Sequence, residues 1–200
     1  MLKKLSMYIV VLTISQLITA CGTVSVSNNL IEKPANTATK INVVYVESNF
    51  NESLQCQSCS TPATYLHMLG YFDVNEKIRN LAPALLANRG VSANVLTMSE
   101  KDFRNGVAAN SFKSSGLDTA LILTFTDGRV SSYGGVGAFM NLSSIYKSST
   151  TNQIYWNGKY TIHVKNTPFI NVNFDDKFVS EMLQRIFTDM ENNGLLPPKR

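Results

Sequence analysis

The chain has 200 residues, of which 44% are hydrophobic and 16% are charged, with 18 Lys and Arg against 14 Asp and Glu. This length suits one domain with a substantial core. The weak net charge of +4 provides no basic surface of the kind that binds nucleic acid, so nucleic acid is not an expected partner.

The N-terminus carries a segment typical of export. Two lysines precede an uncharged apolar run over residues 5–18, which is too short for a comfortable membrane span. Thr19 and Ala20, both small, lie just before Cys21, where a signal peptidase must approach the backbone. The segment Leu17-Ile18-Thr19-Ala20-Cys21-Gly22 is similar to the lipobox of bacterial lipoprotein signals. An ordinary secretory leader and an uncleaved anchor helix are the alternatives.

The lipoprotein resemblance implies a cleaved signal peptide over residues 1–20 and a mature chain that begins at Cys21. It also implies acyl chains, palmitate among them, on the sulfur and amine of Cys21. Several chains make such an anchor persistent, so a membrane is an expected partner. Because Gly22 rather than Asp follows the cysteine, the resemblance favours the cell outer membrane, with the protein facing the periplasm.

Residues 21–39 contain the lipidated cysteine followed by polar residues without an apolar period, which predicts a flexible tether. A tether of this length would hold the domain on the order of 25 Å from the bilayer. The alternative is an added N-terminal strand over Val24 to Val26.

The folded domain is expected over residues 40–200. Its first strand covers residues 41–46, which are β-branched or aromatic in the main, and a long irregular insert over 49–70 follows. A helix is then expected from Asp73 to about Arg89, with apolar residues on one face. Pro83 should bend this helix or divide it into two pieces.

Residues 93–98 predict a short second strand, and Ser99 can cap a helix that runs to about Ser115. Residues 119–125 are apolar at consecutive positions, as expected of a strand covered on both faces. This alternation of strands and helices predicts an α/β sheet with parallel crossovers.

The pattern then changes to period two over residues 154–164, with Trp156 on the expected core face. Residues 142–148 are the expected antiparallel partner, joined by a turn at 150–153. A strongly amphipathic helix from Asp175 to Gly194 closes the chain. We therefore expect an α/β fold, a single mixed sheet of about five strands with helices packed on it, with an α+β arrangement as the alternative.

This order resembles a group of envelope lipoproteins and periplasmic modules. The group includes the amino-terminal domain of TolB, the curli-secretion lipoprotein and the lipoprotein activators of penicillin-binding proteins. Matching segments are Gly-Leu-Asp before the central strand (116–123), the hairpin at 151–156 and the Gly-Leu-Leu end of the last helix (194–196). The resemblance covers roughly residues 40–196, and two features depart from it, the long insert 49–70 and Pro83.

Cys56 and Cys59 are the only paired cysteines, and a disulfide between them is the simplest outcome in an oxidising compartment. Redox activity is the alternative, although the polar residues before Cys56 do not resemble the strand that precedes a thioredoxin-type pair. A zinc site needs about four ligands, and only His67 lies nearby. His163 falls on the polar face of a strand, where we expect it to be solvated. We therefore expect no metal, no cofactor and no catalytic residues.

A glycine-rich connection over residues 128–137 joins two predicted strands and has no phosphate-binding Gly-Lys-Ser/Thr. It can be a mobile loop. The sharper hypothesis is a loop that binds a partner or touches a membrane, because it presents aromatic and apolar side chains in a flexible frame: Tyr133, Val136, Phe139 and Met140.

These observations favour a non-catalytic, outer-membrane-anchored periplasmic lipoprotein that binds an envelope protein in assembly, secretion or cell-wall regulation. One alternative is a structural subunit of an oligomeric secretion or transport assembly, in which case the chain forms a homo-oligomer. A second alternative is a thiol-disulfide active protein that uses Cys56 and Cys59.

Overall fold

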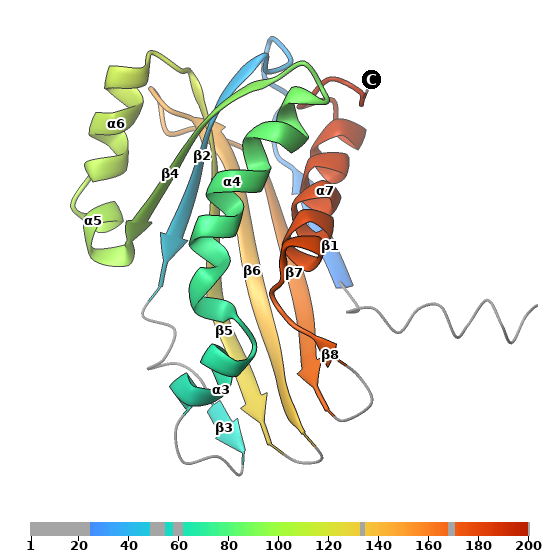
Figure 1. Ribbon diagram of the computed structural model, residues 1–200. Helices are drawn as coiled ribbons and strands as arrows, with labels where there is room; N and C mark the ends of the chain where they lie inside the picture. Colours follow the sequence, from blue (N-terminus) through green and yellow to red (C-terminus); the bar gives the residue numbers. More distant parts are fainter. Residues whose placement is uncertain (1–24, 49–54, 58–61, 133–134, 168–170, 200) are drawn as a thin grey trace, which may run out of the picture.

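The computed structural model describes residues 25–48, 55–57, 62–132, 135–167 and 171–199. Residues 1–20, where a signal peptide is expected, lie outside these ranges, as do Cys21, Cys59 and Tyr133. The described chain forms one mixed sheet of eight strands in the order β1-β7-β6-β5-β2-β4, with β3 beside β5 and β8 beside β7 (Figure 1). The strands are β1 (Ser25–Leu30), β2 (Lys40–Glu47), β3 (Gln55–Gln57), β4 (Ser92–Ser99), β5 (Thr119–Ser131), β6 (Val136–Ser148), β7 (Ile154–Asn166) and β8 (Asn171–Val172).

The predicted fold class is confirmed, and the five expected strands are all present. The helices are α3 (Pro62–Met68), α4 (Val74–Ala87), α5 (Glu100–Arg104), α6 (Val107–Ser115) and α7 (Asp176–Asn192), with a 3-10 turn η1 at Tyr71–Asp73. The sheet exceeds five strands because β1, β3 and β8 add to its edges and ends. These three strands are short or polar, so no hydrophobic period marks them in the sequence.

Half of the sheet is parallel, as expected from the alternation of elements. β2 lies between β4 and β5 and runs parallel to both. Val43 and Tyr45 of β2 belong to the core beneath α4, whereas Val44 and Val46 pack on the opposite face with α6. Coverage on both faces is the reason that the parallel strands are apolar at consecutive positions.

The other half of the sheet is an antiparallel meander of β5, β6, β7 and β1. On one face of the whole sheet α4 and α7 lie side by side, with α4 packed against β4 and β2 (Figure 1). The face turned toward α4 and α7 is apolar, and Trp156 is fully buried in it, as predicted. Asp175 caps α7 by accepting a hydrogen bond from the backbone N–H of Phe178, and Gly194 follows the helix at a φ of +71°. The predicted closing helix is confirmed.

Two sequence predictions need correction in the helical segments, and one alternative is excluded. Pro83 does not divide α4, which continues through it as one helix. The helix expected from Ser99 to Ser115 is two helices, because Gly106 adopts a left-handed φ of +80° between α5 and α6. The insert 49–70 is not irregular throughout, since it contains β3 and α3.

The predicted flexible tether is also wrong over residues 25–39. Residues 25–30 form β1, which pairs in antiparallel register with β7 from Ser25 beside Thr161 to Leu30 beside Trp156. The following segment is held as well: Ala38 is buried and its backbone N–H donates to the carbonyl of Leu195. A strand at this position occupies the edge of β7, whose backbone groups would otherwise lack partners.

Candidate functional site

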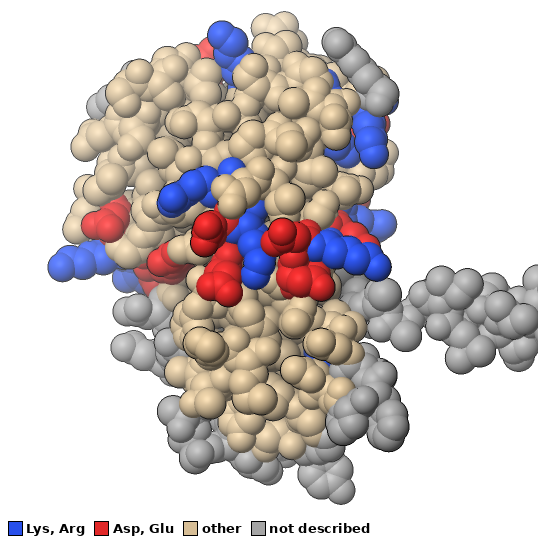
Figure 2. Space-filling model, in the orientation of Figure 1, with Lys and Arg blue, Asp and Glu red and all other residues tan. Residues whose placement is uncertain are grey.

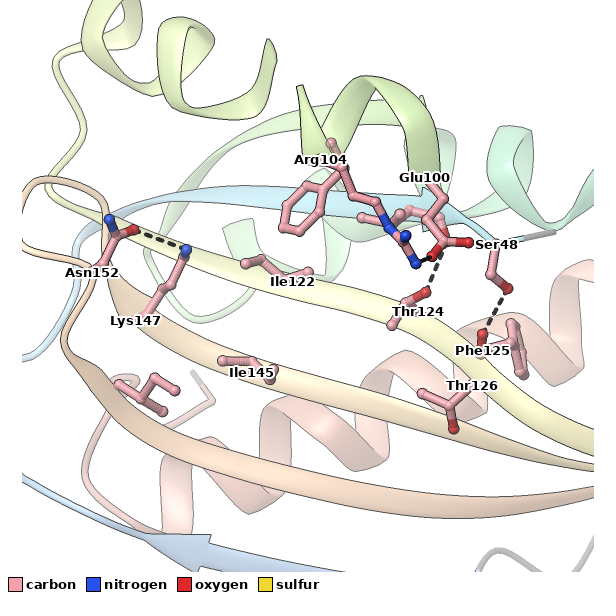
Figure 3. A pocket seen from close by; sticks show the side chains of 13 residues that line it. Ser48, Glu100, Arg104, Ile122, Thr124, Phe125, Thr126, Ile145, Lys147 and Asn152 are labelled. Carbon is pink, nitrogen blue, oxygen red and sulfur yellow. Dashed lines mark hydrogen bonds and ion pairs between the residues drawn. The ribbon is translucent and has the colours of Figure 1, made fainter. Parts of the chain in front are cut away.

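A groove opens on the face of the sheet opposite α4 and α7. α5 and α6 cover only part of this face, above β4, β2 and the start of β5, and none of the described helices lies over the rest (Figure 1). At the border of the covered part, a cavity of about 750 Å³ lies between α5 and the sheet (Figure 3). It is lined by Val46, Ser48, Glu100, Phe103, Arg104, Ile122, Thr124, Phe125, Thr126, Ile145, Lys147, Asn152 and Ile154.

The floor of the groove is aliphatic. Ile122 on β5 and Ile145 on β6 are direct neighbours in the ladder, so their side chains share one face of the sheet. Val46 on β2 continues the floor, and Phe103 of α5 stands at its side. Ile154, at the start of β7, is 39% exposed. Ile122 is buried and Ile145 is half-buried, so Ile154 is the aliphatic side chain of the groove that is most open to solvent.

The rim of the groove carries opposite charges. Arg104 forms an ion pair with Glu100 one helical turn earlier in α5. Across the groove, Nζ of Lys147 donates to the side-chain oxygen of Asn152 at 3.0 Å (Figure 3). Burial lowers the pKa of Lys147. Asn152 holds its position in the turn with a left-handed φ of +61°.

A second exposed feature lies farther along the same face, at the other end of β6. Phe139 is 45% exposed and stacks on His163, with ring centroids 4.0 Å apart and an interplanar angle of 6°. The guanidinium carbon of Arg129 lies 5.9 Å from the centre of the Phe139 ring. Burial, with a smaller contribution from Lys165, lowers the pKa of His163. The expected solvated histidine is therefore a half-buried stacking partner.

The predicted partner-binding loop needs correction. Residues 128–131 and 136–137 belong to β5 and β6, so most of the glycine-rich connection is strand. Val136 and Met140 point into the core and are buried. Of the four candidate side chains, only Phe139 is exposed among the described residues, because alternate residues of a strand face opposite sides of the sheet.

The remaining candidate residues lie at separate places in the fold or outside the described residues. Cys56 lies in β3, beside Val130 of β5, and Cys59 lies outside the described residues. His67 is in the last turn of α3, with its ring 6.4 Å from that of Phe72. No group of three or more potential metal ligands occurs within the described part of the chain.

Sequence reasoning missed the groove, although a signal for its floor was present. Ser143, Ile145 and Lys147 alternate with the buried face of β6, and Ile145 is the apolar exception among them. The side of the groove that α5 forms could not be predicted in this way, because the sequence did not indicate where α5 lies over the sheet.

No protein-family profile matches the chain, and no curated protein matches it. Several solved structures are similar to it, at low sequence identity and low TM-score. The PelC dodecamer from Paraburkholderia phytofirmans is 13% identical, with a TM-score of 0.46 over 88% of this chain and 99% of that chain. Lipoprotein GNA1162 from Neisseria meningitidis is 14% identical, with a TM-score of 0.36 over 77% and 99%.

The C-terminal domain of LpoB from Salmonella enterica is 15% identical, with a TM-score of 0.31 over 64% of this chain and 84% of that chain. The neighbours therefore include a described lipoprotein, but at these identities and scores they carry no information about the function of this chain. None of the described helices has the length and apolarity needed to cross a membrane.

Proposed function

We propose that the protein is a non-catalytic accessory factor, anchored to the outer membrane through Cys21, that binds a periplasmic partner protein. The groove beside α5 carries this proposal, because it presents an aliphatic floor and charged rims on an open face of the sheet. Its role lies in envelope assembly, secretion or cell-wall regulation.

The groove suits one or two aliphatic side chains from a partner. Burying one Leu or Ile side chain on Ile122 and Ile145 would contribute about 1.5–3 kcal/mol. The ion pair of Glu100 and Arg104 on one rim and Lys147 on the other would orient a polar segment and raise the association rate. Proteins use such an apolar centre with a polar rim in protein–protein contacts.

Site-specific photo-cross-linking in intact cells tests the groove. Ile154 lines the groove and is partly exposed, so a benzoyl-phenylalanine in its place should form a discrete adduct with the partner. Adding Ile145→Glu should abolish the adduct, because this change places a carboxylate on the aliphatic floor.

Ser143→Glu is the matched control. It adds the same carboxylate to the same strand and face two residues away, outside the groove and beside Lys159. The adduct should persist in this variant. An adduct that survives Ile145→Glu unchanged would rule out the groove as the partner site.

The anchor has a separate test. Growth with an alkyne analogue of palmitate should label the native chain, and Cys21→Ser should remove the label and leave the precursor uncleaved. Labelling of the Cys21→Ser chain, or no labelling of the native chain, would contradict the anchor.

A further inference from the structure

We propose that one end of the domain rests directly on the leaflet that holds the lipid anchor. This end, called here the contact end, comprises α3, η1 and the ends of β5, β6 and β7 near residues 131, 136 and 166. The inference rests on the acylation of Cys21 proposed above. It starts from the finding that residues 25–30 belong to the sheet.

The short connection to the anchor limits where the domain can be. Only residues 21–24 separate the acylated cysteine from β1, and four residues reach at most about 14 Å when extended. The 25 Å tether expected from the sequence therefore does not exist, and Ser25 must lie within about 14 Å of the bilayer surface.

The direction of β1 decides which end faces the bilayer. β1 begins beside Thr161 of β7 and runs away from the contact end, toward Trp156. β7 ends at Asn166, beside Val136. The distance along β7 from Thr161 to Asn166 is five residues, or about 17 Å. Cys21 can thus reach close to the level of the contact end. The other end of β7 is seven residues or about 23 Å from Thr161, beyond the reach of the connection.

The contact end lacks charge to an unusual degree. Segments 53–72, 130–146 and 166–174 contain no Asp, Glu, Lys or Arg, although 16% of the chain is charged. The fold brings described parts of all three to this end. Figure 2 shows the result on the face formed by α4 and α7, where charged side chains form a band across the middle and the described surface below it is almost free of them.

The contact end also exposes side chains suited to a lipid interface. Met68 of α3 is 51% exposed and Phe72 of η1 is 46% exposed. On the opposite face of the sheet, Lys165 lies one residue from the end of β7 and Arg129 lies near Phe139. These two cations, next to the contact end, match the negative headgroups of anionic phospholipids. A bilayer surface therefore fits this end in polarity and in charge.

Quenching by brominated lipids tests the inference in the full acylated chain. The protein is reconstituted into vesicles of phosphatidylethanolamine and phosphatidylglycerol brominated in their acyl chains. Met68→Trp should lose emission in these vesicles relative to unbrominated ones. Ile31→Trp is the matched control, since Ile31 is also 51% exposed. Its backbone N–H donates a hydrogen bond to the carbonyl of Tyr155, a residue about 36 Å along β7 from the end of that strand at the contact end.

Signal from the buried Trp156 is common to all chains and is subtracted by using the native chain. Phe72→Trp serves as a second probe should Met68→Trp fold poorly. Selective quenching of either contact-end probe supports the inference. Equal quenching of Ile31→Trp overturns it, because the domain would then lie on its side.

Vesicle flotation separates the two proposals. A native chain that does not float removes both the anchor and the inference. A chain that floats without quenching at position 68 or 72 keeps the anchor and overturns the inference. A blue shift of Met68→Trp without bromine quenching also overturns it and assigns this end to a second copy of the chain.

Discussion

At the residue scale, Tyr71 joins the helical layer to the sheet. Its ring makes edge-to-face contacts with Phe125 at 5.4 Å and with Phe174 at 5.8 Å between centroids. Burial raises the pKa of Tyr71 to about 12 and that of Tyr45 well above its ordinary value. Both phenols are therefore still neutral in the folded chain at the pH at which a tyrosine of the unfolded chain begins to ionise.

The pKa of Tyr71 predicts a loss of stability at high pH. Because the folded pKa is above the unfolded value of about 10, the folded chain binds more protons between pH 10 and 12, and its free energy of unfolding falls as pH rises through this range. Tyr71→Phe should reduce this fall, measured by urea denaturation from pH 9 to 12.

Tyr45 keeps part of the pH dependence in that variant, so the slope should become shallower without disappearing. Equal slopes for the native chain and Tyr71→Phe would show that the phenol of Tyr71 ionises as freely in the folded chain as in the unfolded one.

At the element scale, β7 contains a glycine that the core requires. Gly158 lies between Trp156 and Tyr160 on the same buried face. A Cβ at this position would lie 2.7 Å from an atom of the Trp156 ring and 2.9 Å from the Tyr160 ring. The two aromatic side chains therefore occupy the space that a side chain at position 158 would need.

Gly158→Ala should therefore lower the free energy of unfolding by about 1–3 kcal/mol through overpacking. Gly137→Ala in β6 is the matched control, because its Cβ would meet its nearest neighbour, the carbonyl of Val164, at an ordinary 3.5 Å. Urea midpoints of the two variants measure the difference. A stability for Gly158→Ala equal to that of the control would contradict this account of the β7 packing.

Elements whose position depends on burial were predictable. α7 carries apolar rows at helical spacing, β5 is apolar at consecutive positions and β7 alternates, so each pattern specifies its element. β1 was not predictable in this way, because its described side chains at residues 27–30 are exposed and its pairing with β7 is through the backbone. The sequence suggested a strand there only as an alternative to the tether.

At the scale of the whole molecule, the pairing of β1 with β7 is the premise of the membrane contact inferred above. Hydrogen exchange tests it directly: the β1 amides that pair with β7 should exchange much more slowly than in the unfolded chain. A flexible tether over 25–30 would exchange at the unfolded rate. Exchange at that rate would also remove the short connection on which the contact end depends.

The sequence by itself determined the fold class and the apolar faces of the main elements, and it predicted an export signal. Each of these depends on neighbouring residues or on a local period, so it can be predicted from one sequence. Only the tertiary structure decided that the supposed tether is an edge strand, and that Val136 and Met140 are core residues while Phe139 is exposed. It alone assembled the groove from β2, α5, β5, β6 and β7, and the uncharged end from three distant segments. Strand pairing and helix placement over a sheet bring together residues far apart in the chain, and no local pattern specifies those contacts.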